Sequence, residues 1–385
     1  MVNAERLSIR GRHRASASRV WIFARVVFGA LVGVSLVGGV AGGLWRLGVA
    51  LPDPLSFAWT GQVLMVHAAL MICGFLGTVI GIERAVAVKH RSALLAPLAS
   101  GAGALCLVLG QQAAGAWLGV AAAVAFLAVN AVVVRRQHAA HTLLLLVGAA
   151  AWLMGNLLFA LGHDGNAVFP WWFAFLVMTI AAERLEMTRL MRRRPGASTT
   201  LHAVLLLLLA GAAWSGMAPR AGGLVYGTAL VLLAAWLATF DVARRTVFAH
   251  GISRYMAICL LGGYAWLAVA GVAWAMTALG WAGRDAALHA LGLGFVVSMM
   301  MGHAPVVLPA IARVKLQFGA LFYLPLAALH LSLLMRLFLG PFSEPLRAAG
   351  AAFNAATIGF FAATVAGAAV AWRLHHGALG VRKAR

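Results

Sequence analysis

Two histidines stand near the start of two long apolar runs that lie far apart in the chain. His67 opens the run 67–84 and His289 opens the run 289–303; both begin His-Ala and reach a Gly-Phe step within two helical turns. An ionisable side chain inside a membrane helix is costly and is a functional candidate by default. Imidazoles from two facing helices can bind one heme iron from both sides as a low-spin electron-transfer centre. We therefore expect His67 and His289 to face each other and to hold a heme.

The depths of these two histidines agree. His67 lies about five residues, and His289 about three to four residues, from the predicted outer end of its helix. At ~1.5 Å per residue, the depths of the two histidines differ by only a few ångströms. The chain has no Cys-x-x-Cys-His sequence, so such a heme would be a heme b without thioether links. Small residues near the two histidines leave room for a flat macrocycle, although they also serve helix packing; these are Gly74, Gly77, Gly81, Gly292 and Gly294.

A second site is predicted deeper in the same helix. His303 follows His289 by 14 residues, which turn roughly 1400°, nearly four full turns, so the two rings should share a face at opposite depths. His330, on the following predicted helix, is the expected partner of His303. Copper or a second heme could bind there, and Met299, Met300 and Met301 are adjacent soft donors. Flexible core packing is the alternative interpretation of the methionines.

Arg336 is a candidate cofactor-binding residue. It lies toward the outer side of His330, where its guanidinium could pair with the carboxylates of a heme held by His67 and His289. Arg347 is placed similarly. The alternative is that Arg336 extends along the helix to lipid headgroups.

Composition places the chain in a membrane. It is 63% hydrophobic and only 10% charged over 385 residues, whereas soluble domains carry about 25% charged residues. The net charge of +21 would favour nucleic acid in a soluble protein. Here the basic residues lie in the predicted connections between membrane helices, so we expect a lipid bilayer and no nucleic acid as partner. The three cysteines lie inside apolar runs and predict no disulfide framework.

The apolar runs predict an all-α, polytopic membrane protein with twelve helices, each near the ~20 residues that cross a bilayer. The expected spans are 20–45, 62–83, 93–110, 113–134, 140–162, 167–188, 200–217, 222–240, 255–281, 286–310, 319–340 and 349–372. They form one transmembrane domain, 20–373, between a basic segment 1–19 and a basic tail 374–385. Most of the 30 Lys and Arg residues fall in alternate connections, which predicts cytoplasmic N- and C-termini. The excess of Arg over Lys is typical of a GC-rich bacterium, so we expect the inner (plasma) membrane.

An internal repeat accompanies this topology. Residues 175–184 match residues 75–84 at five of ten positions, including a final Glu-Arg. Spans 2, 6 and 10 then each open a block of four helices, which predicts a pseudo-threefold arrangement of four-helix units; chance similarity of short apolar strings is the alternative. The Glu-Arg pairs should be interfacial ion pairs that anchor helices. All nine acidic residues are expected at helix ends or in loops, which disfavours a proton or cation transporter.

Twelve spans with both termini inside, blocks of four helices and histidines high on spans 2 and 10 resemble the heme-copper oxidase subunit I superfamily. Within it, the His-Ala openings are most similar to the NnrS family of heme- and copper-containing membrane proteins linked to the nitric oxide response. This resemblance implies that His67 and His289 are the axial pair of a low-spin heme. Span 6 carries no histidine, span 7 only His202, and position 291 is Leu291. The oxygen-reducing centre of an oxidase is therefore not expected.

Three functions remain open at this point. The first is a heme-binding membrane protein in the nitric oxide response or in membrane electron transfer. The second is an oxidoreductase acting on nitric oxide or quinol, with a second metal site at His303 and His330. The third is a cofactor-free transporter or assembly factor. A partner subunit or a homo-oligomer is compatible with each of them.

Overall fold

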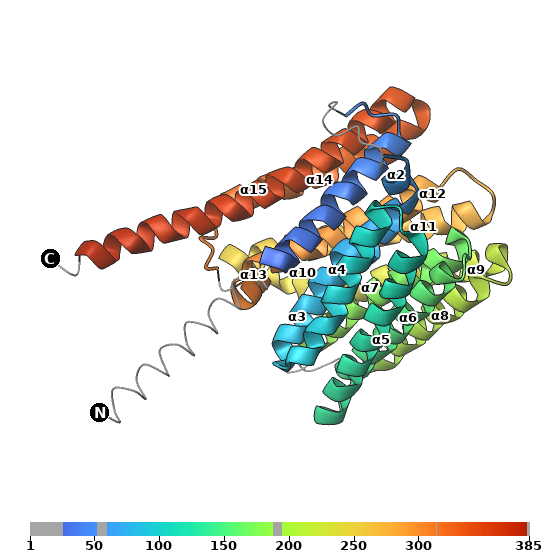
Figure 1. The fold of residues 1–385 in the computed structure, drawn as a ribbon, viewed down its shortest axis with the longest axis horizontal. Coiled ribbons are helices and arrows are strands. Elements are labelled where there is room, and N and C mark those ends of the chain that lie inside the picture. The colour runs from blue at the N-terminus through green and yellow to red at the C-terminus, as the bar shows by residue number, and fades with distance from the viewer. Residues whose placement is uncertain (1–25, 52–59, 188–194, 313, 383–385) are drawn as a thin grey trace.

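The computed structural model describes residues 26–51, 60–187, 195–312 and 314–382, and those residues form an all-helical bundle (Figure 1). Twelve helices in the described part of the chain are long and apolar enough to cross a membrane. By helix length and hydropathy the protein is therefore a multi-pass membrane protein. The twelve are Val26–Arg46, Gly61–Val88, Arg91–Val108, Gln112–Arg136, Ala140–Ala160, Gly165–Met187, Ala197–Ser215, Pro219–Phe240, Gly251–Ala278, Arg284–Ala312, Ala320–Phe342 and Glu344–His375.

These helices match the twelve predicted spans, with ends that differ by a few residues. The start of the first predicted span, 20–25, and the basic segment 1–19 lie outside the described residues. The last helix, α15 (Glu344–Arg382), continues well past the predicted end at residue 372 (Figure 1). The pseudo-threefold arrangement and the sidedness stay predictions.

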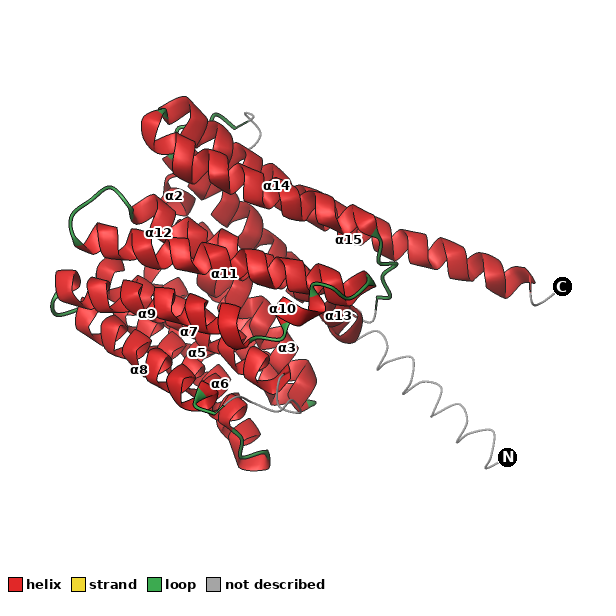
Figure 2. Ribbon diagram, turned by 180° about the vertical axis from the view of Figure 1, so that it is seen from behind, coloured by secondary structure: helices red, strands yellow, loops and turns green. Residues whose placement is uncertain are grey.

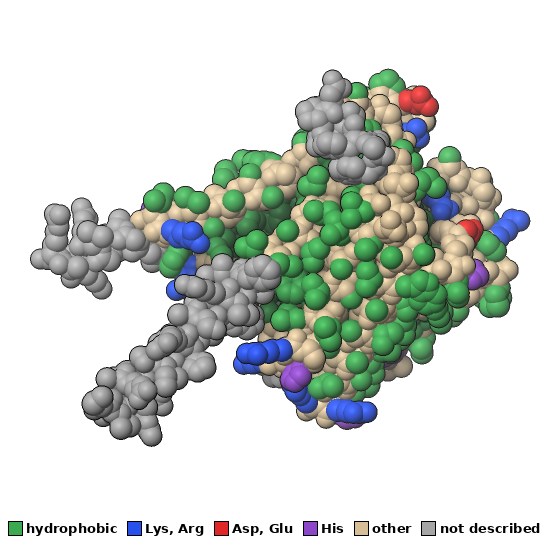
Figure 3. Space-filling model, in the orientation of Figure 1, with side chains coloured by type: hydrophobic (Ala, Val, Ile, Leu, Met, Phe, Trp, Pro, Cys, Tyr) green, Lys and Arg blue, Asp and Glu red, His purple; other side chains and the backbone are tan. Residues whose placement is uncertain are grey.

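The outer surface of the bundle is apolar along its length. Figure 3 shows hydrophobic side chains spread over the middle of the visible face, with Lys and Arg gathered toward its ends. Large side chains such as Met65 and Leu206 are 76% and 66% exposed. Soluble monomers rarely expose contiguous apolar patches above a few hundred Å². This surface is suited to contact with lipid tails.

The helices differ in how far they are enclosed. In α7 (Gly165–Met187) 78% of the most apolar 18-residue stretch is buried. In the first and the last span only 22% of the corresponding stretch is buried. Figure 2 shows α7 within the bundle and α15 along its side. In the spans Gly61–Val88 and Arg284–Ala312, which carry His67 and His289, 61% and 67% of the most apolar 18-residue stretch is buried. The candidate ligands are thus borne by interior helices.

Three π-helical segments interrupt the described spans. They are Leu70–Gly77, between α2 (Thr60–Ala69) and α3 (Thr78–Val88); Ala290–Val297, between α12 (Arg284–His289) and α13 (Ser298–Ala312); and Met335–Leu339, after α14 (Tyr323–Leu334). A π-turn adds one residue to the hydrogen-bonded ring and rotates the side chains that follow it. Such segments are rare and occur frequently at functional sites.

The first two spans approach each other through small residues. A Cβ at Gly42 would lie 2.2 Å from the carbonyl oxygen of Val63, and one at Gly39 would lie 2.7 Å from the sulfur of Met71. Because the neighbour of Gly42 is backbone, only glycine permits this approach, as in other membrane helix pairs. This contact brings the first span against the face of α2 that carries His67.

Candidate functional site

His67 and His289 lie side by side in the interior of the bundle. Their ring centroids are 6.2 Å apart and their planes differ by 23°. Two imidazoles that bind one metal from opposite sides, each with a metal–nitrogen bond of about 2 Å, have centroids roughly 6 Å apart. The observed centroid separation is of the size that such a pair would have.

The ring of His67 is held by the first span. Its Nδ1 lies 2.6 Å from the carbonyl oxygen of Gly39. Because a carbonyl can only accept, Nδ1 carries the proton in this contact and Nε2 keeps its lone pair. Gly43, one turn further along, backs the ring: a Cβ there would lie 2.8 Å from Cε1 of His67. The absence of a side chain at position 43 therefore makes room for the imidazole.

The ring of His289 is held by its own helix and by the π-helical segment Met335–Leu339. Its Nδ1 lies 3.0 Å from the carbonyl oxygen of Asp285 and 3.0 Å from the carboxylate Oδ1 of the same residue. Both partners accept, so Nδ1 is again the protonated nitrogen. Nε2 then accepts a hydrogen bond from Nη2 of Arg336 at 3.2 Å. The same lone pair is the one that a metal would use.

Arg336 and Asp285 form a two-bond ion pair beside the rings. Nη2 and Nε of Arg336 donate to Oδ1 and Oδ2 of Asp285 at 2.8 and 3.1 Å. Arg336 is only 7% exposed, and the Asp285 side chain is 35% exposed. Bidentate pairs of this kind fix geometry as well as charge. They link α12 to the π-helical segment Met335–Leu339 that follows α14.

All three predicted residues lie at π-helical segments. His289 directly precedes the segment Ala290–Val297, His67 lies three residues before Leu70–Gly77, and Arg336 lies inside Met335–Leu339. Each side chain of the site therefore lies inside a π-helical segment or within one helical turn of its start. This coincidence separates His67, His289 and Arg336 from histidines and arginines elsewhere in the bundle.

His303 and His330 have different surroundings, and no contact between them is found in the described residues. Nδ1 of His303 lies 2.7 Å from the carbonyl oxygen of Met299, while its Nε2 is buried without a hydrogen-bond partner. His330 stacks on Trp266, whose indole nitrogen donates to its Nδ1 at 2.8 Å. No group of three or more His, Cys, Asp and Glu side chains suited to a metal ion occurs in the described ranges. A second metal at His303 and His330 stays a hypothesis.

One of the two Glu-Arg sequences takes part in a buried ion pair at the other end of the bundle. Arg184 donates two hydrogen bonds to the carboxylate of Asp241, at 2.8 and 3.2 Å. Asp241 also accepts from the backbone nitrogen of Ala243 at 2.7 Å. This buried bond joins α7 to the end of α9 (Pro219–Phe240), so the anchor is between elements distant in the sequence.

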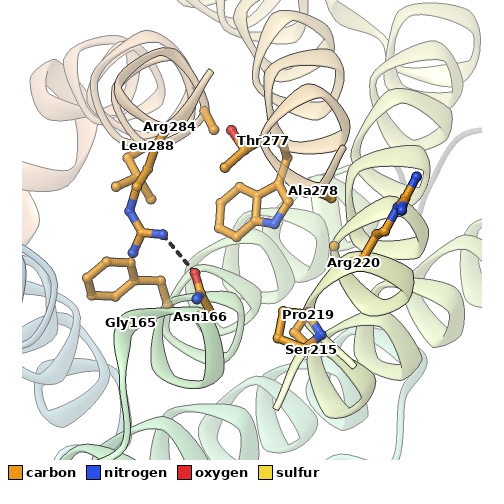
Figure 4. A pocket seen from close by; sticks show the side chains of 13 residues that line it. Gly165, Asn166, Ser215, Pro219, Arg220, Thr277, Ala278, Arg284 and Leu288 are labelled. Carbon is orange, nitrogen blue, oxygen red and sulfur yellow. Dashed lines mark hydrogen bonds between the residues drawn. The ribbon is translucent and has the colours of Figure 1, made fainter. Parts of the chain in front are cut away.

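A cavity of about 150 Å³ lies behind α12, between the ends of α7, α9 and α11 (Gly251–Ala278). Figure 4 shows Arg284 reaching across it to Asn166, while Arg220 points away. Arg284 donates to Oδ1 of Asn166 at 2.7 Å and lies over the ring of Phe169, 5.5 Å from its centroid. Leu288, the residue before His289, lines the same cavity. Arg284 therefore contacts α7, whereas its neighbour Asp285 contacts Arg336.

The comparison with known families covers nearly the whole bundle. Residues 25–370 match the model described as domain of unknown function DUF8744. The chain belongs to this family. No curated protein matches the sequence. The family thus extends over all twelve helices, and the function must be argued from the site itself.

Asp285 and Gly43 were not foreseen as parts of the site. Asp285 precedes His289 by four residues, the spacing at which two helical side chains meet, so this carboxylate could have been predicted from the sequence. The role of Gly43 depends on which helix packs against α2, and the local sequence does not indicate which helix that is.

Proposed function

We propose that this protein is a heme-binding membrane protein in which His67 and His289 hold one heme b. The 6.2 Å separation of their rings carries the proposal. Support also comes from the hydrogen bonds of both Nδ1 atoms to oxygen acceptors, which leave the lone pair of each Nε2 as the one that could bind a metal. On His289 this lone pair accepts a hydrogen bond from Arg336, which a metal would have to replace. Ligating histidines usually donate their other N–H in this way. A heme with two histidine ligands supplies one-electron transfer.

The surrounding residues have definable roles in such a site. Asp285 orients the imidazole of His289, and the backbone of Gly39 orients that of His67. Arg336 would give up its contact with Nε2 of His289 and keep its two bonds to Asp285. In that position its guanidinium offers a positive charge to a carboxylate of the cofactor.

The test uses the intact chain purified in mild detergent from heme-replete cells. We expect a six-coordinate b-type signal in the reduced-minus-oxidised spectrum and at least one iron per chain. His67→Ala and His289→Ala should each abolish that signal. His330→Ala is the matched control, because His330 is bonded to Trp266 and should not affect a heme held by His67 and His289. A colourless wild-type protein, or full heme in both ligand variants, would overturn the proposal and favour a transporter or an assembly factor.

By its resemblance to NnrS proteins, we place this heme in the nitric oxide response or in membrane electron transfer. A second candidate function is an oxidoreductase for nitric oxide or quinol. The buried, unpartnered Nε2 of His303 favours it, because such an atom normally has a partner. Iron and copper counts on the same sample decide between them. One iron without copper, in a protein that turns over neither substrate, would contradict the enzyme.

A further inference from the structure

The two candidate ligands have unequal hydrogen-bond partners. His67 donates to a neutral backbone carbonyl, that of Gly39. The Nδ1 of His289 instead lies against the Asp285 carboxylate, which is itself bonded twice by Arg336. A carboxylate and a guanidinium therefore contact the ring of His289 directly, whereas the ring of His67 is hydrogen-bonded to a neutral carbonyl.

We propose that Asp285 is a positioning residue that, together with Arg336, sets the reduction potential of the iron. This inference rests on the proposed heme site. A carboxylate on Nδ1–H makes the imidazole a stronger donor to the metal and places negative charge near the iron, both of which favour the ferric state. The Arg336 guanidinium acts in the opposite direction. Because the two charges are paired, their effects offset each other in the native protein.

The sign of each substitution follows from this arrangement. Asp285→Asn keeps a hydrogen-bond acceptor but removes the negative charge, so the potential should rise. Arg336→Gln removes the positive charge and leaves Asp285 unbalanced, so the potential should fall. We expect each change to reach about tenfold in the reduction equilibrium, or about 59 mV for one electron. The double variant should return close to the wild-type potential.

The experiment is a redox titration of the purified heme-loaded chain, with low-temperature electron paramagnetic resonance of the ferric form. Asp285→Asn should also change the low-spin g values, because the partner of the His289 N–H is altered. Arg336→Lys keeps the charge and should stay near the wild-type potential, even if the bidentate geometry is lost. Arg284→Gln is the control: it removes a positive charge from the adjacent position, where Arg284 is exposed and bonded to Asn166, and should have little effect.

The outcomes separate this inference from the proposed function. A wild-type protein without heme would contradict the proposed function itself. A wild-type protein with a heme on His67 and His289 would leave that function standing. If Asp285→Asn and Arg336→Gln then shifted the potential in the same direction, or not at all, Asp285 would be a purely structural residue and the inference would be wrong.

Discussion

At the scale of single residues, the site depends on groups that hold the imidazoles rather than on the imidazoles alone. The ring of His67 is in place because Gly43 has no side chain and because Gly39 presents its carbonyl oxygen. The residue types that could bind a metal, and their similar depth, were evident from the sequence. The supporting contacts were not, because they come from a helix whose neighbours only the fold determines.

Gly43→Val should displace the His67 ring. A Cβ at position 43 would lie 2.8 Å from Cε1 and 3.0 Å from Nδ1 of His67, and such overpacking typically costs about 1–3 kcal/mol. We expect a lower melting temperature and a reduced heme content. Gly33→Val on the same helix is the control, since nothing lies within 4 Å of a Cβ there. Equal behaviour of the two variants would show that position 43 does not support the ring.

At the scale of elements, sequence reasoning located the helices but not their irregularities. Apolar runs of about 20 residues identify spans because a bilayer demands that length. The π-helical segments Leu70–Gly77 and Ala290–Val297 leave no equivalent pattern, since one additional residue per turn barely disturbs a run that is apolar on all sides. The prediction that His289 and His303 share one helix face assumes a regular α-helix between them. Because the π-helical segment Ala290–Val297 lies between the two residues, that assumption does not hold.

The buried pair Arg184–Asp241 should contribute to how α7 is held in the bundle. Removing one partner of a buried salt bridge typically costs about 3–5 kcal/mol. Asp241→Asn should therefore lower the melting temperature in detergent, and Arg184→Met combined with Asp241→Asn should recover much of the loss. Asp164→Asn, at the exposed start of α7, should cost far less. A single Asp241→Asn variant as stable as the native chain would contradict this role.

At the scale of the whole molecule, the number of helices was predictable, whereas their arrangement and sidedness rest on weaker arguments. The positive-inside bias predicts cytoplasmic termini, and an even number of crossings places both termini on one side. Helix packing, by contrast, is decided by pairwise contacts such as that between Gly42 and Val63. A sequence read in order does not reveal those pairs.

Single cysteines at the two ends of α6 (Ala140–Ala160) test the orientation. His163 and His138 are exposed just beyond opposite ends of this helix, whereas Cys73 and Cys259 are buried. On a Cys106→Ala background, His163→Cys should react with an impermeant maleimide in intact cells. His138→Cys should react only after the cells are broken. The reverse pattern would invert the topology and place the His67–His289 pair near the cytoplasmic face.

The restraint of the two imidazoles also has a consequence for affinity. Each ring is bonded at Nδ1, His67 by the first span and His289 by Asp285, so neither is free to sample other rotamers. The rotational entropy of both side chains is therefore lost when the chain folds, and not when a cofactor arrives. Immobilising a side chain on association costs about 0.5–1.5 kcal/mol. A cofactor that enters this site avoids that loss twice, which favours slow release over repeated exchange.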